Sequence, residues 1–412
     1  MRGLVVGLLP AWFICFSCTA DFSAAAPPRD ISNVHQRVVG GKIVQSERDE
    51  QEALFNYYFR NHSLTYETRL ASLKSEASVP DWRIPYSADI HPEGAGGLGD
   101  VTGGRAAVQG RYGSRRIESG MSGGSSVLSL YDLAFNGGEN LANSYEIRRI
   151  MGTDRALFPR LRMRVASEGW EGYCSGFTAS TIRHPEPVRP VDAGRIGGTP
   201  GVVFQPSDIK ALLTGIYNRT TDDSYLYLAP PSGTGGGPNM GTFHLALANY
   251  IGQADHPIGI DRTRGEEAWN NPIYAYKVSS IRDAGTRDGV QYKDVSTTVT
   301  YSSYGSDAQG QTDPRTGART GNRKQSATFR YLLALDSEGR IVGGRLSGGA
   351  VHFLWISLYA VQGREDGAVP GNPYIDVRRV IALARASALP EVQKQYDQAT
   401  IGPLIDPALA KQ

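Results

Sequence analysis

Helical patterns fill the first half of this chain, and strand patterns follow one another in the second half. Apolar side chains recur at helical spacing over residues 45–76, 127–134, 143–150 and 206–218, the last with Ser207 as its expected N-cap. Strand patterns then cover 242–251, 258–261, 271–280 and 292–302, before a hairpin that turns at 337–339 and a final helix over 375–388. Consecutive strands that are segregated from helices predict an α+β fold.

The first residues have the features of an export signal. Arg2 precedes an apolar run of about fifteen residues that contains Pro10, shorter than the ~20 residues a membrane span needs. We expect a signal peptide over 1–26, cleaved after Ala20 or within 24–26; the alternative is a lipoprotein with Cys18 at its new N-terminus. The protein is therefore predicted to be secreted, to the extracellular space or the periplasm.

Four segments are predicted along the chain. After the signal peptide, a helical and Gly-rich N-terminal region covers 27–125, a catalytic domain covers 126–360, and a helical extension covers 361–412. The formal net charge of the 412 residues is only +2, which argues against a nucleic-acid partner. No internal segment is apolar over the length of a membrane span.

Cys174 is the only cysteine expected in the mature chain, because Cys15 and Cys18 leave with the signal. It lies in GWEGYCSGFTAS, where a Gly-rich approach and small residues predict a helix that begins near the cysteine. A helix N-terminus lowers the pKa of a thiol and favours the nucleophilic thiolate. The alternative is a buried, unreactive cysteine.

A cysteine nucleophile needs a base, and His244 is the candidate among seven histidines. It lies within the predicted strand 242–251, and Asp261 follows 17 residues later at the end of the next strand. Two antiparallel strands would bring the pair together, so that Asp261 orients the imidazole. The backbone N–H of Cys174 and the indole of Trp170 are candidate oxyanion donors, although Trp170 is equally a packing residue.

Metal binding is left open by the sequence. No zinc-type spacing of ligands occurs. The carboxylates of Asp222, Asp223, Glu266 and Glu267 are possible Ca²⁺ ligands, but such residues are more often solvated at a surface. The metal is therefore unknown, and no cofactor is certain.

Four separated blocks of the chain resemble the transglutaminase elicitor family, which includes secreted oomycete cell-wall enzymes and bacterial relatives. The blocks are the region around Cys174, FQPSDIKALLTGIY, FHLALANYIG and IDRTRGEEAWNNPIYAYKV, and the likeness extends over about residues 125–358. AWNNPIYAYKVSS is similar to the family's plant-recognised surface segment VWNQPVRGFKVYE. The residues that carry this similarity are Trp269, Asn270, Pro272, Tyr276, Lys277 and Val278. The hairpin continuing IVGGRLSGGAVHFLW is similar to a family ending of the kind GGEW…HPDFLW, with the Trp and the aspartate lost.

The resemblance implies a papain-like or transglutaminase-like core, in which the Cys174 helix packs on an antiparallel sheet that carries His244 and Asp261. It implies that Cys174 forms a thioester with a protein glutamine and passes the acyl group to a primary amine. Oomycete members are described as calcium-dependent, so Ca²⁺ is possible here. Host or cell-surface proteins are possible partners.

Two other functions remain open. The same scaffold suits a cysteine protease or a protein glutamine deamidase, because water can capture the thioester in place of an amine. The changed elicitor-like segment and the altered hairpin ending also allow an exported binding protein whose catalytic site is vestigial.

Overall fold

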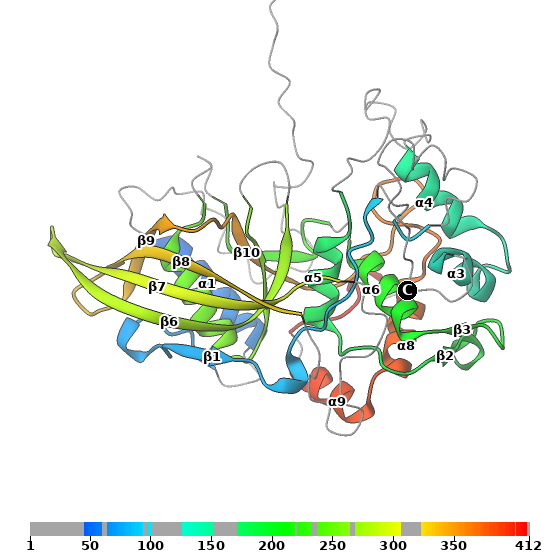
Figure 1. Ribbon diagram of the computed structural model, residues 1–412, viewed down its shortest axis with the longest axis horizontal. Coiled ribbons are helices and arrows are strands. Elements are labelled where there is room, and N and C mark those ends of the chain that lie inside the picture. The colour runs from blue at the N-terminus through cyan, green and yellow to red at the C-terminus, as the bar shows by residue number, and fades with distance from the viewer. Residues whose placement is uncertain are drawn as a thin grey trace, which may run out of the picture.

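A computed structural model describes residues 45–59, 64–93, 97–99, 126–151, 171–218, 221–231, 237–263, 268–305, 323–399 and 401–409 (Figure 1). The expected signal peptide, Trp170, Glu266 and Glu267 lie outside these residues. The division of the chain into four segments therefore stays a prediction.

An eight-stranded antiparallel sheet forms the centre of the fold. Its strands follow the order β4-β10-β5-β6-β7-β8-β9, and β1 pairs with β6 beside this path. The strands are β1 (Glu76–Ser78), β4 (Tyr225–Ala229), β5 (Ile258–Asp261), β6 (Asn270–Arg287), β7 (Val290–Ser302), β8 (Lys324–Leu335), β9 (Ile341–Gly348) and β10 (Phe353–Ser357). A separate short pair joins β2 (Val191–Asp192) to β3 (Val203–Phe204).

Helices cover the sheet and build the other side of the molecule (Figure 1). The α-helices are α1 (Gln45–Phe59), α3 (Val127–Phe135), α4 (Leu141–Met151), α5 (Cys174–Arg183), α6 (Pro206–Tyr217), α7 (Met240–Ala246), α8 (Val377–Ser387) and α9 (Pro390–Ala399). Shorter turns are η2 (Leu70–Ser72), η3 (Asp81–Arg83), η5 (Ala193–Ile196) and η6 (Leu247–Ile251). In the part of the chain that is described, no helix combines the length and the apolar character that a membrane crossing requires.

The α+β class is confirmed, and so are most of the predicted elements. The strands expected over 258–261, 271–280 and 292–302 correspond to β5, β6 and β7, and the expected hairpin is β8–β9. The first helix ends at Phe59 rather than continuing to residue 76. Helix α6 is capped by Gln205 instead of Ser207, because the Asp208 carboxylate accepts the Gln205 backbone N–H at 2.8 Å and completes a capping box.

The strand predicted over 242–251 is wrong: this segment is helix α7 followed by the π-helical turn η6. Both faces of the segment are buried, so its alternation of large and small side chains did not separate a core side from a solvent side. A short buried run of this kind does not distinguish a strand from a helix. The Asn239 side chain starts the helix by accepting the backbone N–H groups of Gly241 and Thr242.

Two apolar cores position the elements around α5. One lies between the sheet, α1 and α7, and the other joins α3, α6 and α8. Helix α5 lies between these two parts and packs closely on α6 (Figure 1). Gly176 permits this approach, because a Cβ atom there would overlap the carbonyl oxygen of Thr214. The cysteine-bearing helix is thus fixed against both the sheet and α6.

Candidate active site

Cys174 is the first residue of α5, as the sequence predicts. The preceding residue, Tyr173, donates its backbone N–H to Ile90 O at 2.6 Å. The Tyr173 hydroxyl contacts Glu146, and Arg149 donates to that hydroxyl at 2.7 Å. Arg149 also pairs with Glu93 at 2.8 Å. This buried ion-pair network holds the turn that places the thiol at the helix N-terminus.

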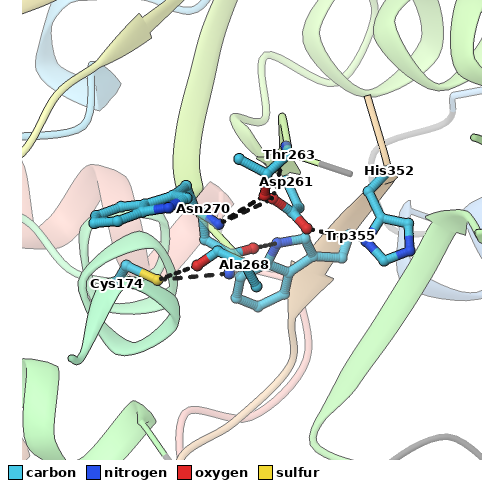
Figure 2. Close-up of polar contacts among 8 residues, drawn as sticks. Cys174, Asp261, Thr263, Ala268, Asn270, His352 and Trp355 are labelled. Atoms are coloured by element: carbon cyan, nitrogen blue, oxygen red, sulfur yellow. Dashed lines mark hydrogen bonds and ion pairs between the residues drawn. The ribbon is translucent and has the colours of Figure 1, made fainter. Parts of the chain in front are cut away.

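The Cys174 thiol lies beside the start of strand β6. The sulfur donates to the carbonyl oxygen of Ala268 at 3.2 Å, and the Asn270 side-chain amide donates to the sulfur at 3.7 Å (Figure 2). Trp355 Nε1 donates to Asn270 Oδ1 at 2.9 Å. Because the Asn270 oxygen is occupied by the indole, its NH₂ group is the end that faces the sulfur.

The pKa of the Cys174 thiol is raised, which is opposite to the direction expected from a helix N-terminus alone. Burial is the largest cause, and the charge of Asp261 adds to it. The N–H groups of Asn270, backbone and side chain, and of Ser175 act against these effects, because they stabilise the thiolate. The site therefore holds a protonated thiol whose surrounding donors are already directed at the sulfur.

We expect removal of the Asn270 donor to make the thiol less reactive. The variant Asn270→Leu keeps a similar volume but loses the N–H that stabilises the thiolate. Its alkylation by iodoacetamide at pH 7.5 should be about tenfold slower, since a hydrogen bond to a charged group is worth roughly 1.5–3 kcal/mol. Asn271→Leu is the matched control, because the Asn271 side chain accepts from Arg262 and does not donate to the sulfur. Equal rates in the two variants would contradict this role.

Asp261 is fully buried at the end of β5. One carboxylate oxygen accepts the backbone N–H and the hydroxyl of Thr263, at 3.1 and 2.7 Å, and the backbone N–H of Trp269 at 3.0 Å. The other oxygen lies 3.1 Å from His352 Nδ1. The sheet register explains this meeting, because Asp261 is paired with Asn270 on β6 and with Phe353 on β10.

The imidazole that contacts Asp261 belongs to His352, which the sequence analysis did not select. Its backbone N–H donates to Asp261 O at 2.9 Å, and its side chain is 34% exposed. Nδ1 faces the carboxylate, so Nε2 is the ring nitrogen left to exchange a proton. The ring lies across Trp355 from the Cys174 sulfur (Figure 2). The position of His352 within GGAVHFLW, which is similar to a family ending, was the available signal.

His244 lies in a different environment. It is buried on α7, with Nδ1 at 2.7 Å from the Tyr331 hydroxyl, which in turn lies 2.7 Å from Thr297 Oγ1. Burial lowers the pKa of His244 to about 4. The hairpin that was expected to bring His244 beside Asp261 does not form, because residues 240–251 are helical. The His244 ring bonds to Tyr331 rather than to Cys174 or Asp261.

Buried histidines predict acid sensitivity of the fold. Burial lowers the pKa of His244 to about 4 and that of His184 to about 3. Between those values and about 6.5 the unfolded chain binds protons that the native chain does not. Stability should therefore fall as pH drops, by about 2 kcal/mol per buried histidine between pH 6.5 and 5.

Urea unfolding at several pH values measures this dependence. His244→Gln should make it shallower by the contribution of one histidine, because one of the titrating rings is gone. Tyr331→Phe removes the hydrogen-bond partner of His244 but keeps the buried ring, and should retain the wild-type dependence. A pH dependence unchanged in His244→Gln would contradict the assignment.

The elicitor-like segment forms the start of β6 and lines the site. Its Trp269 ring stacks on Tyr304 with centroids 5.8 Å apart, and both rings and Cys174 pack against the same small apolar cluster. In this segment Pro272 and Tyr276 are buried and Val278 is half-buried. Lys277 is well exposed and pairs with Glu76 at 2.8 Å. The segment expected at the surface is therefore largely part of the sheet.

Metal binding is not resolved by the described residues. No group of three His, Cys, Asp or Glu side chains able to hold a metal ion occurs among them. Of the four carboxylates considered for Ca²⁺, Asp223 accepts from the Thr221 hydroxyl at 2.5 Å, and Glu266 and Glu267 lie outside the described residues.

The comparisons with known proteins agree with this arrangement. Residues 237–386 match the family model described as Transglutaminase elicitor. The resemblance inferred from the sequence is confirmed. The match contains Asp261, Asn270 and His352, whereas Cys174 precedes it. No curated protein matches the chain.

A solved structure shares the fold. The crystal structure of the GP42 transglutaminase from Phytophthora sojae matches with a TM-score of 0.55 and 18% sequence identity. The match covers 82% of this chain and 98% of the other. The α+β architecture of this chain is therefore similar to that of this transglutaminase.

Proposed function

We propose that this chain is a secreted transglutaminase-type acyltransferase with Cys174 as its nucleophile. The observation that carries the proposal is the convergence of N–H donors from Asn270 and Ser175 on the Cys174 sulfur at the N-terminus of α5. The family match and the transglutaminase fold support the same chemistry. The apolar N-terminal segment supports export.

In the proposed reaction the thiol first leaves the Ala268 carbonyl and transfers its proton to His352. The thiolate attacks the carboxamide carbon of a protein glutamine. The Asn270 NH₂ group, which Trp355 orients toward the sulfur, stabilises the oxyanion that forms. The leaving nitrogen takes the proton from His352 and departs as ammonia. A primary amine then attacks the thioester and gives a proton to His352. His352 returns this proton to the leaving thiolate, which restores the thiol.

Asp261 supports this proton transfer by holding His352 through Nδ1 and stabilising the imidazolium. The thiol contacts a carbonyl and an amide in this structure, and Trp355 lies between it and the His352 ring (Figure 2). Proton exchange between the two groups therefore passes through water or follows displacement of the thiol from Ala268.

Incorporation of a fluorescent primary amine into a glutamine-rich protein tests the proposal. The mature chain is assayed with Ca²⁺ and with a chelator, and ammonia is measured in parallel. Amine incorporation with equimolar ammonia supports a transglutaminase, and the chelator arm reports any need for Ca²⁺. Ammonia without incorporation indicates a deamidase, peptide cleavage indicates a protease, and either outcome would contradict the proposed acyl acceptor.

A catalytically vestigial binding protein is the second candidate. The observation that favours it is the contact of the thiol with a carbonyl rather than with an imidazole, and burial also raises the pKa of this thiol. Thiol reactivity separates the two candidates. In an enzyme, a glutamine substrate analogue that occupies the site should protect Cys174 from alkylation, whereas a vestigial protein should show the same rate with and without it.

A further inference from the structure

Two buried arginines lie away from the Cys174 site and have no carboxylate partner. Arg83 ends the turn η3 and Arg183 ends helix α5, and each is 1% exposed. Within the described part of the chain neither forms an ion pair, although Asp255 is near enough to act on Arg83 electrostatically. Burial of an uncompensated charge is costly, and buried charges in proteins are normally paired.

The unpaired atoms of Arg83 form a fork. Nε and Nη2 are both buried and without a hydrogen-bond partner. These two nitrogens lie on the same edge of a guanidinium, with N–H bonds that point in parallel, and this edge matches two oxygens of one carboxylate, phosphate or sulfate. The group is held near the rings of Trp82 and Tyr396, whose centroids are 5.8 and 5.9 Å from its central carbon.

Arg183 is fixed in the same cluster by the C-terminal segment. Its terminal nitrogens donate to the carbonyl oxygens of Ile401, Gly402 and Pro403, and its Nε has no partner. His256 Nδ1 contacts Pro257 O at 2.6 Å, while its buried Nε2 is also unpaired. The charges of Arg83 and Arg183 both lower the pKa of His256 after burial, so the three side chains share one region.

We propose that Arg83, Arg183 and His256 form a buried site for a small oxyanion. The free fork of Arg83 binds two oxygens of the anion, Arg183 Nε supplies a further donor, and the anion provides the negative charge that the cluster lacks. The site lies at the opposite end of α5 from Cys174 and joins this helix to η3, α9 and the segment 401–403. Its occupant would stabilise the helix that carries the cysteine, whatever reaction the cysteine performs.

Thermal unfolding in defined anions tests the site. The full mature chain is dialysed into HEPES and NaCl, then titrated with sodium phosphate, sulfate or acetate at constant ionic strength. The Tm should rise by at least about 2 °C and saturate at millimolar oxyanion. Saturation by phosphate or sulfate identifies an inorganic oxyanion, and saturation by acetate alone identifies a carboxylate ligand.

Arg83→Gln should lose this saturable rise, and its Tm without oxyanion should equal or exceed that of the wild type because an unpaired buried charge has been removed. Arg287→Gln is the matched control, since that arginine is exposed on the β6–β7 hairpin and should keep the full response. A general salting effect of sulfate is not saturable and would be the same in all variants.

Equilibrium dialysis of the wild type against radiolabelled phosphate provides a second measurement that needs no variant, and should retain about one phosphate per chain. Arg83→Lys, which keeps the charge but lacks the fork, should bind about tenfold more weakly. The proposal is overturned if the wild type shows the same Tm in chloride and in all three oxyanions, or if Arg83→Gln retains the saturable rise.

Discussion

Cys174→Ala is expected to abolish incorporation of a primary amine into a glutamine-rich protein, with kcat lowered by at least about 10³-fold. The proposed reaction needs a thioester, and an alanine methyl group has no lone pair with which to form one. The substitution removes a half-buried sulfur whose contacts are Ala268 O and the Asn270 amide, so the fold should be retained. Circular dichroism and the Tm check this retention.

Ser175→Ala is the matched control. Its hydroxyl donates to Asn218 Oδ1 at 3.0 Å and faces away from the chemistry, and its backbone N–H is unchanged by the substitution. This variant should keep near wild-type activity. Amine incorporation that persists in Cys174→Ala would show that the proposed nucleophile is wrong, and incorporation lost equally in both variants would point to damage of the helix rather than to loss of a thiolate.

Strands such as β7 could be predicted because one of their faces meets solvent. In β7, Val295, Thr297, Val299 and Tyr301 are buried while residues 296, 298 and 300 are more exposed, and this difference is what produces a period of two. Helix α7 could not be predicted in the same way. Every residue of 240–251 is buried, so the sequence carries no contrast between two faces from which to infer a period.

The candidate site was predicted only where local sequence defines position. A Gly-rich approach followed by small residues places Cys174 at a helix N-terminus, and the end of a short apolar strand places Asp261. The partner of Asp261 depends on sheet order instead. Strand β10 pairs with β5 although His352 follows Asp261 by 91 residues, and no local pattern specifies that pairing. His244 was selected because residues 242–251 were expected to form a strand that pairs with the strand of Asp261, and this segment is helical.

His352→Ala is expected to lower kcat for amine incorporation by about 10²–10⁴-fold, the range typical for loss of a general acid–base group. His244→Gln should lower the Tm, because the bond to the Tyr331 hydroxyl is lost, but should leave kcat close to that of the wild type. The contrast follows from contacts: His352 meets the Asp261 carboxylate, and His244 is enclosed between α7 and the sheet. Steady-state kinetics of both variants at pH 7.5 make the comparison.

External imidazole separates a proton-transfer role from a structural one. The His352 side chain is 34% exposed, so its removal opens a site that solvent imidazole can enter next to Asp261. Activity of His352→Ala should therefore rise with imidazole concentration and saturate. The same addition should not affect His244→Gln, whose position is closed to solvent. If His244→Gln instead loses activity at an unchanged Tm while His352→Ala remains active, the base is His244, and the protein must then rearrange α7 to bring that ring to the thiol.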